Sequence, residues 1–384
     1  MKLFEPLQIG DSQLLHRVVL APLTRFRGTD VHVPGITAPE YYAQRASAPG
    51  TLLITEATFI AARAGGYPNA PGIWNEDQIE GWKKVTSAVH AKGSFIYLQL
   101  WALGRAANPA QLAKEGITNG YVSSSSVSRG KAAAVGFPPS KTLSIPEIHE
   151  YVQLYATAAE NAITAGFDGV EVHGGGQTPF YVDDQALMRT NGYLIDQFTQ
   201  DVVNKRTDEY GGTIENRSRF ALEVVDAVVK RVGPQKTGFR VSPWGSFDGE
   251  RTADPIPTFS YLISSLLSAH PELAYIHAVE PRIDVATTRT EVPEHESNDF
   301  IRKIVREAKG PTQFIAAGGY TREQAIEAAE KGDLVAFGRA YIANPDLPRR
   351  LKENIPLAKG NRETYYIPGD TTGLGYTDYP FADV

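Results

Sequence analysis

The sequence lacks several features that define common classes of protein. No cysteine occurs among its 384 residues, which excludes disulfides, thiolate nucleophiles, cysteine-ligated zinc and iron–sulfur clusters. No run of about 18 apolar residues is present, so the sequence predicts no membrane-spanning helix. The residues after Met1 contain no apolar segment of the kind found in secretory signals, and we therefore expect a cytoplasmic location.

An excess of basic residues is also missing. The chain has 38 Lys and Arg against 44 Asp and Glu, a formal net charge of −6, which argues against a general nucleic-acid-binding protein. Hydrophobic residues make up 42% of the chain and charged residues 21%, so the chain can bury a large core. Intrinsic disorder is thereby excluded as the main state.

Eight short runs rich in β-branched and other apolar residues recur along the chain. Each run is almost continuously hydrophobic, which is typical of parallel strands that are buried on both faces. The runs are Arg17–Ala21, Thr51–Thr55, Phe95–Leu100, Gly169–His173, Thr237–Ser242, Ala274–Val279, Gln313–Ala317 and Leu334–Phe337.

Most of the intervening segments have helical periodicity. Ser144-Ile145-Pro146-Glu147 is a capping box with proline in the first turn, and it predicts a helix over His149–Ala165. Further helices are predicted over Phe220–Val232, Asn298–Ala308 and Thr321–Lys331.

Two long segments are less regular. Trp101–Leu143 contains no clear helix until its end, and we expect it to form a loop over one end of the fold. The segment from Asn344 to Val384 is expected to pack near the same end or along the side.

Eight buried strands that alternate with helices predict an α/β fold, a single-domain TIM (β/α)₈ barrel over residues 1–384. A doubly wound sheet is the alternative, but it normally has fewer strands and a glycine fingerprint. Neither G-x-G-x-x-G nor G-x-x-x-x-G-K-[ST] occurs in the sequence.

In a barrel, the chemistry lies at the carboxyl ends of the strands. These ends carry no carboxylate cluster for Mg²⁺ or a glycosidase and no histidine cluster for zinc, so we expect no metal site. Gly318-Gly319 and Gly338-Arg339 follow the last two strands, where barrels commonly bind phosphate through backbone N–H groups. A phosphate-bearing organic cofactor is therefore predicted.

Several motifs together identify a known family. They are Pro22-Leu23-Thr24-Arg25, Gln99-Leu100-Trp101, Val170-Glu171-Val172-His173, the segments 191–198 and 205–217, Phe337-Gly338-Arg339 and Asn344-Pro345-Asp346-Leu347. In this order they resemble the old yellow enzyme family, most closely its fungal branch. The resemblance implies an FMN-binding TIM barrel that is reduced by NADPH and in turn reduces activated alkenes (enones, enals, nitroalkenes) by a ping-pong mechanism. It also implies a small-molecule substrate and a monomer or homodimer.

The resemblance implies a role for each matched cofactor residue. Arg240 would lie beside the pyrimidine end of the flavin, Gln99 would bond the same edge, and the Thr24 hydroxyl would bond its other carbonyl. Glycine turns and the Arg339 guanidinium would hold the phosphate. The full cofactor-binding set is Pro22, Thr24, Ala57, Gln99, Arg240, Gly318, Gly319, Gly338 and Arg339.

The resemblance also implies the residues that meet the substrate. His173 and Asn191 would donate hydrogen bonds to its carbonyl or nitro oxygen, and Tyr193 would give the α carbon a proton. The apolar substrate slot would be lined by Trp101, Phe247 and Tyr366.

The chain departs from the family pattern in one place. Only two residues separate the histidine and asparagine in the family motif, whereas residues 174–190 separate His173 from Asn191 here. Replacing Gly175–Thr190 by one small residue would restore the motif, so an in-frame retained intron and a genuine loop insertion are both open hypotheses. We expect FMN binding to be retained and ene-reductase activity to be weakened.

The sequence also suggests three other functions. The insertion raises the hypothesis of a catalytically impaired flavin-binding barrel, and a fungal biosynthetic pathway could use an isomerase or cyclisation activity on the same scaffold. Tyr193 favours reduction over the latter, because it is a proton donor. His173-Gly174-Gly175-Gly176 matches an esterase oxyanion motif, but an α/β-hydrolase also needs a G-x-S-x-G elbow, which this sequence lacks.

Overall fold

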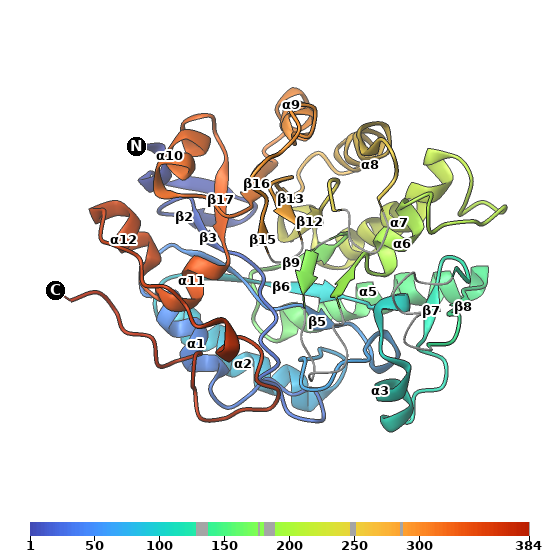
Figure 1. The fold of residues 1–384 in the computed structure, drawn as a ribbon, viewed down its shortest axis with the longest axis horizontal. Helices are drawn as coiled ribbons and strands as arrows, with labels where there is room; N and C mark the ends of the chain where they lie inside the picture. The colour runs from blue at the N-terminus through green and yellow to red at the C-terminus, as the bar shows by residue number, and fades with distance from the viewer. Residues whose placement is uncertain (128–136, 176, 180–188, 246–250, 285–286, 384) are drawn as a thin grey trace.

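The computed structural model describes residues 1–127, 137–175, 177–179, 189–245, 251–284 and 287–383. Within these residues, eight parallel strands form a closed barrel (Figure 1), in which β4 pairs with β6 to complete the ring. All eight predicted strands are confirmed, and the doubly wound alternative is wrong because the sheet closes on itself. The strands are β3 (Val18–Leu20), β4 (Leu52–Ile54), β6 (Phe95–Trp101), β9 (Gly169–His173), β12 (Thr237–Val241), β13 (Tyr275–Val279), β16 (Gln313–Ala317) and β17 (Leu334–Phe337).

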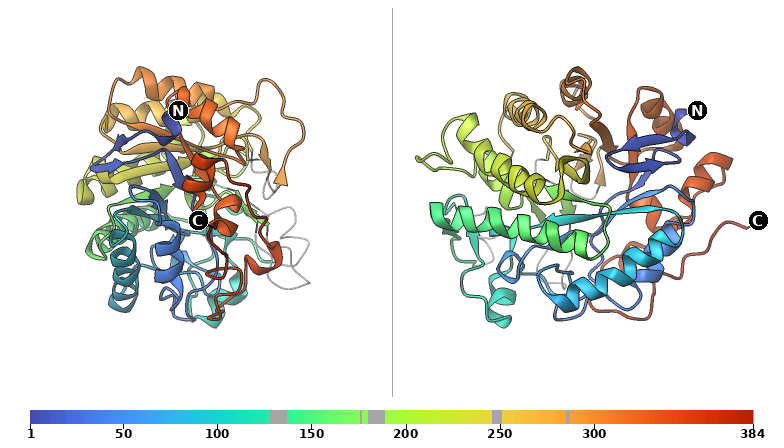
Figure 2. Two further views of the ribbon diagram at one scale, coloured as in Figure 1. Left: turned by 90° about the vertical axis from the view of Figure 1, so that its left-hand side faces the viewer. Right: turned by 180° about the vertical axis from the view of Figure 1, so that it is seen from behind.

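Helices surround the barrel, and from behind α2 and α5 cross its outer face (Figure 2). The four predicted helices are confirmed as α5, α7, α9 and α10. α7 begins earlier than predicted, because the Thr213 hydroxyl accepts a hydrogen bond from the Asn216 N–H and caps the helix there. The main helices are α1 (Ala38–Arg45), α2 (Glu76–His90), α5 (Ile145–Thr164), α7 (Ile214–Val232), α8 (Pro255–Ala269), α9 (Asp299–Glu307), α10 (Arg322–Glu330), α11 (Arg339–Ala343) and α12 (Leu347–Glu353).

Side chains of alternate strand residues divide the core into an outer layer and a barrel interior. Val19, Leu52 and Ile315 belong to a buried apolar cluster of the interior. The antiparallel hairpin of β1 (Leu7–Ile9) and β2 (Ser12–Leu14) adds Ile9 and Leu14 to the same cluster. This hairpin precedes β3, so it covers the amino ends of the strands and leaves the carboxyl ends open for a site.

The expectation that Trp101–Leu143 has no helix until its end is wrong. Helix α3 (Pro109–Lys114) lies in this segment, because the Asn108 side chain accepts from the N–H groups of Ala110 and Gln111 and proline occupies the first turn. Two short strands, β7 (Val122–Ser123) and β8 (Lys141–Thr142), pair in parallel. Leu103 and Leu112 pack in the same cluster as Trp101, so this part of the segment covers one side of the barrel's carboxyl end.

The capping box of α5 forms as the sequence predicts. The Ser144 N–H and hydroxyl both donate to the Glu147 carboxylate, at 2.9 and 2.8 Å, and Lys141 forms an ion pair with it. The Lys141 ammonium and the Ser144 N–H lower the pKa of Glu147 to about 2.

Replacing Glu147 with alanine should lower the free energy of unfolding by about 1 kcal/mol at pH 7, the usual contribution of a helix cap. Because the folded-state pKa is depressed, this contribution is present above the unfolded pKa and is lost as the pH falls towards 2. Urea unfolding at pH 7 and pH 3 measures both effects. Gln153→Ala, on the exposed side of the same helix, is the control. A Glu147→Ala deficit that is equal at both pH values would contradict the assignment.

Candidate active site

A cavity of about 300 Å³ lies at the carboxyl ends of β3, β12, β13, β16 and β17. Tail residues Arg362, Tyr365 and Tyr366 form another part of its wall. The expectation that the tail packs at this end is therefore confirmed for these residues. The cavity brings together Pro22, Arg240, Gly318, Gly319, Gly338, Arg339 and Tyr366 from the residues predicted to form the site.

One end of the cavity is suited to an anion. Gly319 has φ +64°, and a Cβ there would approach Ile283 and Thr288 to 3.3 Å, so a side chain would fill the space that a ligand needs. The Arg339 guanidinium lies 3.6 Å from that position and donates to the Thr288 hydroxyl at 3.0 Å. The backbone turn and the cation together match the predicted phosphate site.

Away from the anion end, the site contains buried side-chain nitrogen atoms of an arginine and a histidine. Arg240 on β12 pairs in register with His173 on β9, and both are buried. Neither Arg240 Nε nor His173 Nδ1 has a hydrogen-bond partner in the described part of the chain. Burial, together with Arg240 and His277, lowers the pKa of His173 well below its usual value, so its imidazole is neutral. Buried polar groups without a protein partner indicate a polar ligand.

Tyr193 lies between His173 and Trp101. Its ring centroid is 4.8 Å from that of His173 and 5.0 Å from that of Trp101, with interplanar angles of 73° and 86°. Trp101 also stacks on Phe59 at 4.9 Å. Trp101 and Tyr193 are almost completely buried, so the aromatic cluster holds the phenol firmly beside the imidazole.

The segment between His173 and Asn191 starts and ends as a hairpin. β10 (Gln177–Pro179) pairs antiparallel with β11 (Arg189–Asn191), and Gln177 is opposite Asn191. The two ends of the segment are therefore adjacent, which returns the chain to the barrel at Gly192. Helix α6 (Leu194–Thr199) follows, and the Leu194 N–H donates to the Ala102 carbonyl at 3.0 Å. This local pairing explains how Tyr193 reaches His173 despite the intervening residues.

The other predicted residues lie in several places. Gln99 is buried inside the barrel, and its Nε2 donates to Glu171 Oε1 at 2.6 Å. Thr24 and Ala57 are buried and are not among the cavity's lining residues. Phe247 lies outside the described residues, and only the backbone of Asn191 is described.

Sequence reasoning missed Glu171 and His277, which join Gln99 and Arg240 inside the barrel. Glu171 stands two residues before His173 on the same strand, so period-two alternation could have placed it on the same inner face. Nothing in the sequence singled out His277, because its neighbours come from other strands.

Three buried arginines that follow β3 or lie on α1 hold the tail against the barrel. Arg25 donates to the carbonyls of Tyr365 and Gly375, at 3.0 and 2.6 Å. Arg27 donates to Thr364 and Leu374, each at 2.9 Å, and forms an ion pair with Asp370. Arg45 donates to the carbonyl of Tyr376 at 3.2 Å. These contacts fix the segment that carries the tail part of the cavity wall.

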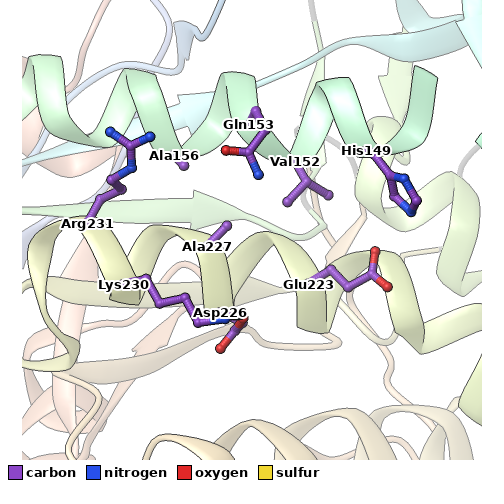
Figure 3. Close-up of a pocket in the computed structure, with 9 residues that line it drawn as sticks. All are labelled: His149, Val152, Gln153, Ala156, Glu223, Asp226, Ala227, Lys230 and Arg231. Carbon is purple, nitrogen blue, oxygen red and sulfur yellow. Dashed lines mark hydrogen bonds and ion pairs between the residues drawn. The ribbon is translucent and has the colours of Figure 1, made fainter. Parts of the chain in front are cut away.

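A second cavity, between α5 and α7, lies on the outer surface of the barrel (Figure 3). Lys230 forms an ion pair with Asp226, and His149 bonds the Tyr210 hydroxyl, which donates to Glu223 at 2.9 Å. Its charged groups thus have partners, and that of Arg231 is Glu160. The lining residues lie on α5 and α7 and not at the carboxyl ends of the strands, and we assign the chemistry to the first cavity.

The residues that the structure describes contain no group of at least three His, Asp or Glu side chains placed to hold a metal ion. None of their helices is both long enough and apolar enough to cross a membrane.

Residues 2–358 match the model of the NADH:flavin oxidoreductase / NADH oxidase family. The chain belongs to this family, that of the old yellow enzymes. Chanoclavine-I aldehyde reductase fgaOx3 of Penicillium roqueforti is 49% identical over 388 residues, 99% of this chain and 96% of that protein. The NADP-dependent oxidoreductase lnbE of Aspergillus flavus is 44% identical over 389 residues, 100% of this chain and 97% of that protein. An Old Yellow Enzyme from Pichia sp. superposes with TM-score 0.84 at 37% identity, over 99% of this chain and 93% of that one.

FMN is the cofactor of this old yellow enzyme. The residues present fit it, because a glycine turn and Arg339 match a phosphate and the unpartnered Arg240 Nε matches a polar ring edge. The predicted TIM barrel, family and cofactor are thus confirmed.

Loosening the tail should weaken FMN binding. Asp370→Ala removes the ion pair of Arg27, and residues 362–366 lose part of their anchor. We expect the FMN dissociation constant to rise about tenfold, equivalent to about 1.4 kcal/mol. Quenching of flavin fluorescence during titration of the apoprotein measures it. Asp378→Ala, an exposed carboxylate of the same tail, should leave the constant unchanged. Equal constants for both variants and the wild type would rule out the anchoring role.

Proposed function

We propose that this chain is an NADPH-dependent ene-reductase that reduces enones, enals or nitroalkenes by a ping-pong mechanism. The observation that carries the proposal is the contact between His173 and Tyr193, a neutral hydrogen-bond donor beside a phenol, next to the buried Arg240. Reduction of an activated alkene needs a donor for the substrate's oxygen and a separate source of a proton. The name of lnbE supports NADPH as the reductant.

In this proposal, FMN held at this site would supply the hydride that reduces the β carbon of the alkene, with NADPH as the source of the reducing equivalents. The protein holds the cofactor through the phosphate turn formed by Gly318, Gly319, Gly338 and Arg339, and through Arg240 and Gln99 at the ring. Pro22, Thr24 and Ala57 complete the contacts with the cofactor.

His173 and Asn191 bind the substrate's carbonyl or nitro oxygen. Because the pKa of His173 is far below its usual value, its imidazole donates as a neutral group at every physiological pH. The hydrogen bonds draw electron density towards the oxygen and make the β carbon electrophilic. Tyr193 gives its phenolic proton to the α carbon, so a hydride and a proton together saturate the double bond. Trp101, Phe247 and Tyr366 shape the apolar slot.

Two alternatives remain as competing proposals, an impaired flavin-binding barrel and an isomerase or cyclisation activity. The hairpin supports reduction over both, because the pairing of β10 with β11 returns Tyr193 to His173. The described residues 177–179 and 189–190 of the segment 175–190 nevertheless follow the carboxyl end of β9, where a substrate must enter. We therefore propose that it limits access rather than dismantling the pair.

Tyr193→Phe should slow the oxidative half-reaction with a cyclic enone by roughly 10²-fold or more, the usual contribution of a general acid. Reduction of the flavin by NADPH should be almost unchanged, because it does not use the phenolic proton. Stopped-flow absorbance separates the two half-reactions. Tyr67→Phe is the matched control, since Tyr67 also contacts Trp101 and its hydroxyl donates to the Ala106 carbonyl at 2.7 Å. Equal slowing of both half-reactions by Tyr193→Phe would indicate a packing role instead.

Replacing Gly175–Thr190 by a single alanine should raise kcat/KM for the enone at least tenfold, equivalent to about 1.4 kcal/mol of barrier. The gain should appear mainly in KM, because the pair of His173 and Tyr193 is already in contact. FMN content should be equal in the two proteins. If the full-length chain matches the shortened variant, the segment is a tolerated loop.

The origin of the segment is tested separately. Transcript reads that all skip the codons for residues 175–190 would identify a retained intron, whereas reads that contain them would identify a genuine insertion.

A further inference from the structure

Four polar side chains from four consecutive strands of the barrel wall lie close together in its interior. They are Gln99 on β6, Glu171 on β9, Arg240 on β12 and His277 on β13, and each is at most 7% exposed. Gln99 is opposite Glu171 in the strand register, and Arg240 is opposite His277. Gln99 and Arg240 belong to the proposed flavin site, whereas Glu171 and His277 have no part in the mechanism above.

Both oxygens of the Glu171 carboxylate are occupied by neutral donors. Gln99 Nε2 donates to Oε1 at 2.6 Å, and His277 Nδ1 donates to Oε2 at 2.7 Å. An ionised carboxylate only accepts hydrogen bonds, so it must face the amide NH₂ of Gln99 and the protonated ring nitrogen of His277. The amide oxygen of Gln99 is thereby left as an acceptor for another group.

Glu171 stabilises Arg240 without forming an ion pair with it. No salt bridge joins the two side chains in the described residues, where the Glu171 carboxylate is bonded to His277 instead. Burial alone would raise the pKa of Glu171. His277, Arg240 and Gln99 lower it by a larger amount, so the net shift of the pKa is downward and the carboxyl group is ionised. Burial also lowers the pKa of Arg240, and Glu171 is the main charge that opposes this shift.

We propose that Glu171 is a positioning residue for the flavin. Gln99 and His277 hold its carboxylate where it balances the charge of Arg240 while the guanidinium stays available to the cofactor, and the same contact directs the Gln99 amide oxygen to the pyrimidine edge. This inference rests on the proposed placement of Arg240 and Gln99 at that edge.

The test compares the binding of oxidised and reduced FMN. The quantity is the dissociation constant of oxidised FMN divided by that of reduced FMN, and it is obtained from the reduction potential of the bound flavin. Two-electron reduction makes the flavin more anionic, so the unbalanced Arg240 of Glu171→Gln should favour the reduced form. We expect the ratio to rise at least tenfold, a positive shift of about 30 mV for a two-electron couple.

His277→Phe should act in the opposite direction. It removes the donor that holds Oε2, so the carboxylate can approach Arg240 and compete with the cofactor for the guanidinium. The ratio should then fall below that of the wild type. Asp333→Asn is the matched control, because it neutralises another buried carboxylate, which is paired with Arg302 and Arg306. Asp333 precedes β17 and therefore lies at the amino end of that strand, away from the proposed flavin site. Its ratio should equal that of the wild type.

The expected changes in the ratio have opposite signs for Glu171→Gln and His277→Phe, which distinguishes a positioning role from a general structural role. A ratio for Glu171→Gln that stays within the spread of the Asp333→Asn control, or a shift of both variants in one direction, would overturn the inference. If Glu171→Gln retains no FMN, the sign of the His277→Phe shift decides alone. The potential is measured without an alkene, so a wild-type protein that binds FMN but reduces no enone would contradict only the proposed function.

Discussion

The closure of the parallel sheet between β4 and β6 is the constraint on which the rest of the structure depends. A closed barrel has no free edge, and it gathers the carboxyl ends of all eight strands into one ring. The hairpin of β1 and β2 seals the opposite end with Ile9 and Leu14. Ligand access is therefore confined to one end, and the glycine turns that follow β16 and β17 are brought next to Arg240 although they are distant in sequence.

Closure also forces polar side chains into a water-poor interior. A buried charge without compensation costs several kcal/mol, so an arginine inside the barrel needs an anion within range. Glu171 meets this need, and its bonds to Gln99 and His277 leave the guanidinium unengaged by any carboxylate in the described structure. Tuning of the flavin and stability of the fold thus depend on the same few buried groups. The neutral state of His173 has the same origin, because burial beside Arg240 disfavours a second positive charge.

Much of the fold could be predicted from the sequence, because strand hydrophobicity and helix caps are local signals. The box at Ser144 predicted α5, and the glycine pairs after the last strands predicted residues that line the cavity. The partners of Glu171 could not be predicted, since they depend on the register between strands. The helix capped by Asn108 was missed because it is short and lies in a segment with loop-like composition. The hairpin that pairs Gln177 with Asn191 could not be predicted, because the sequence of its strands has no hydrophobic pattern typical of a hairpin.

The contacts of Arg25 and Arg27 with the C-terminal tail determine the order in which parts of the structure form during synthesis. Arg25 and Arg27 leave the ribosome long before Tyr365, whose carbonyl Arg25 binds and whose side chain lines the cavity. During synthesis, the buried guanidinium groups have no tail carbonyls to bind and the cavity has no wall on this side. The barrel strands are complete at Phe337, so a nearly finished nascent chain can already hold its sheet. Enclosure of the cofactor is therefore a late event in biogenesis, and a chain truncated after α12 would be a barrel with an open site.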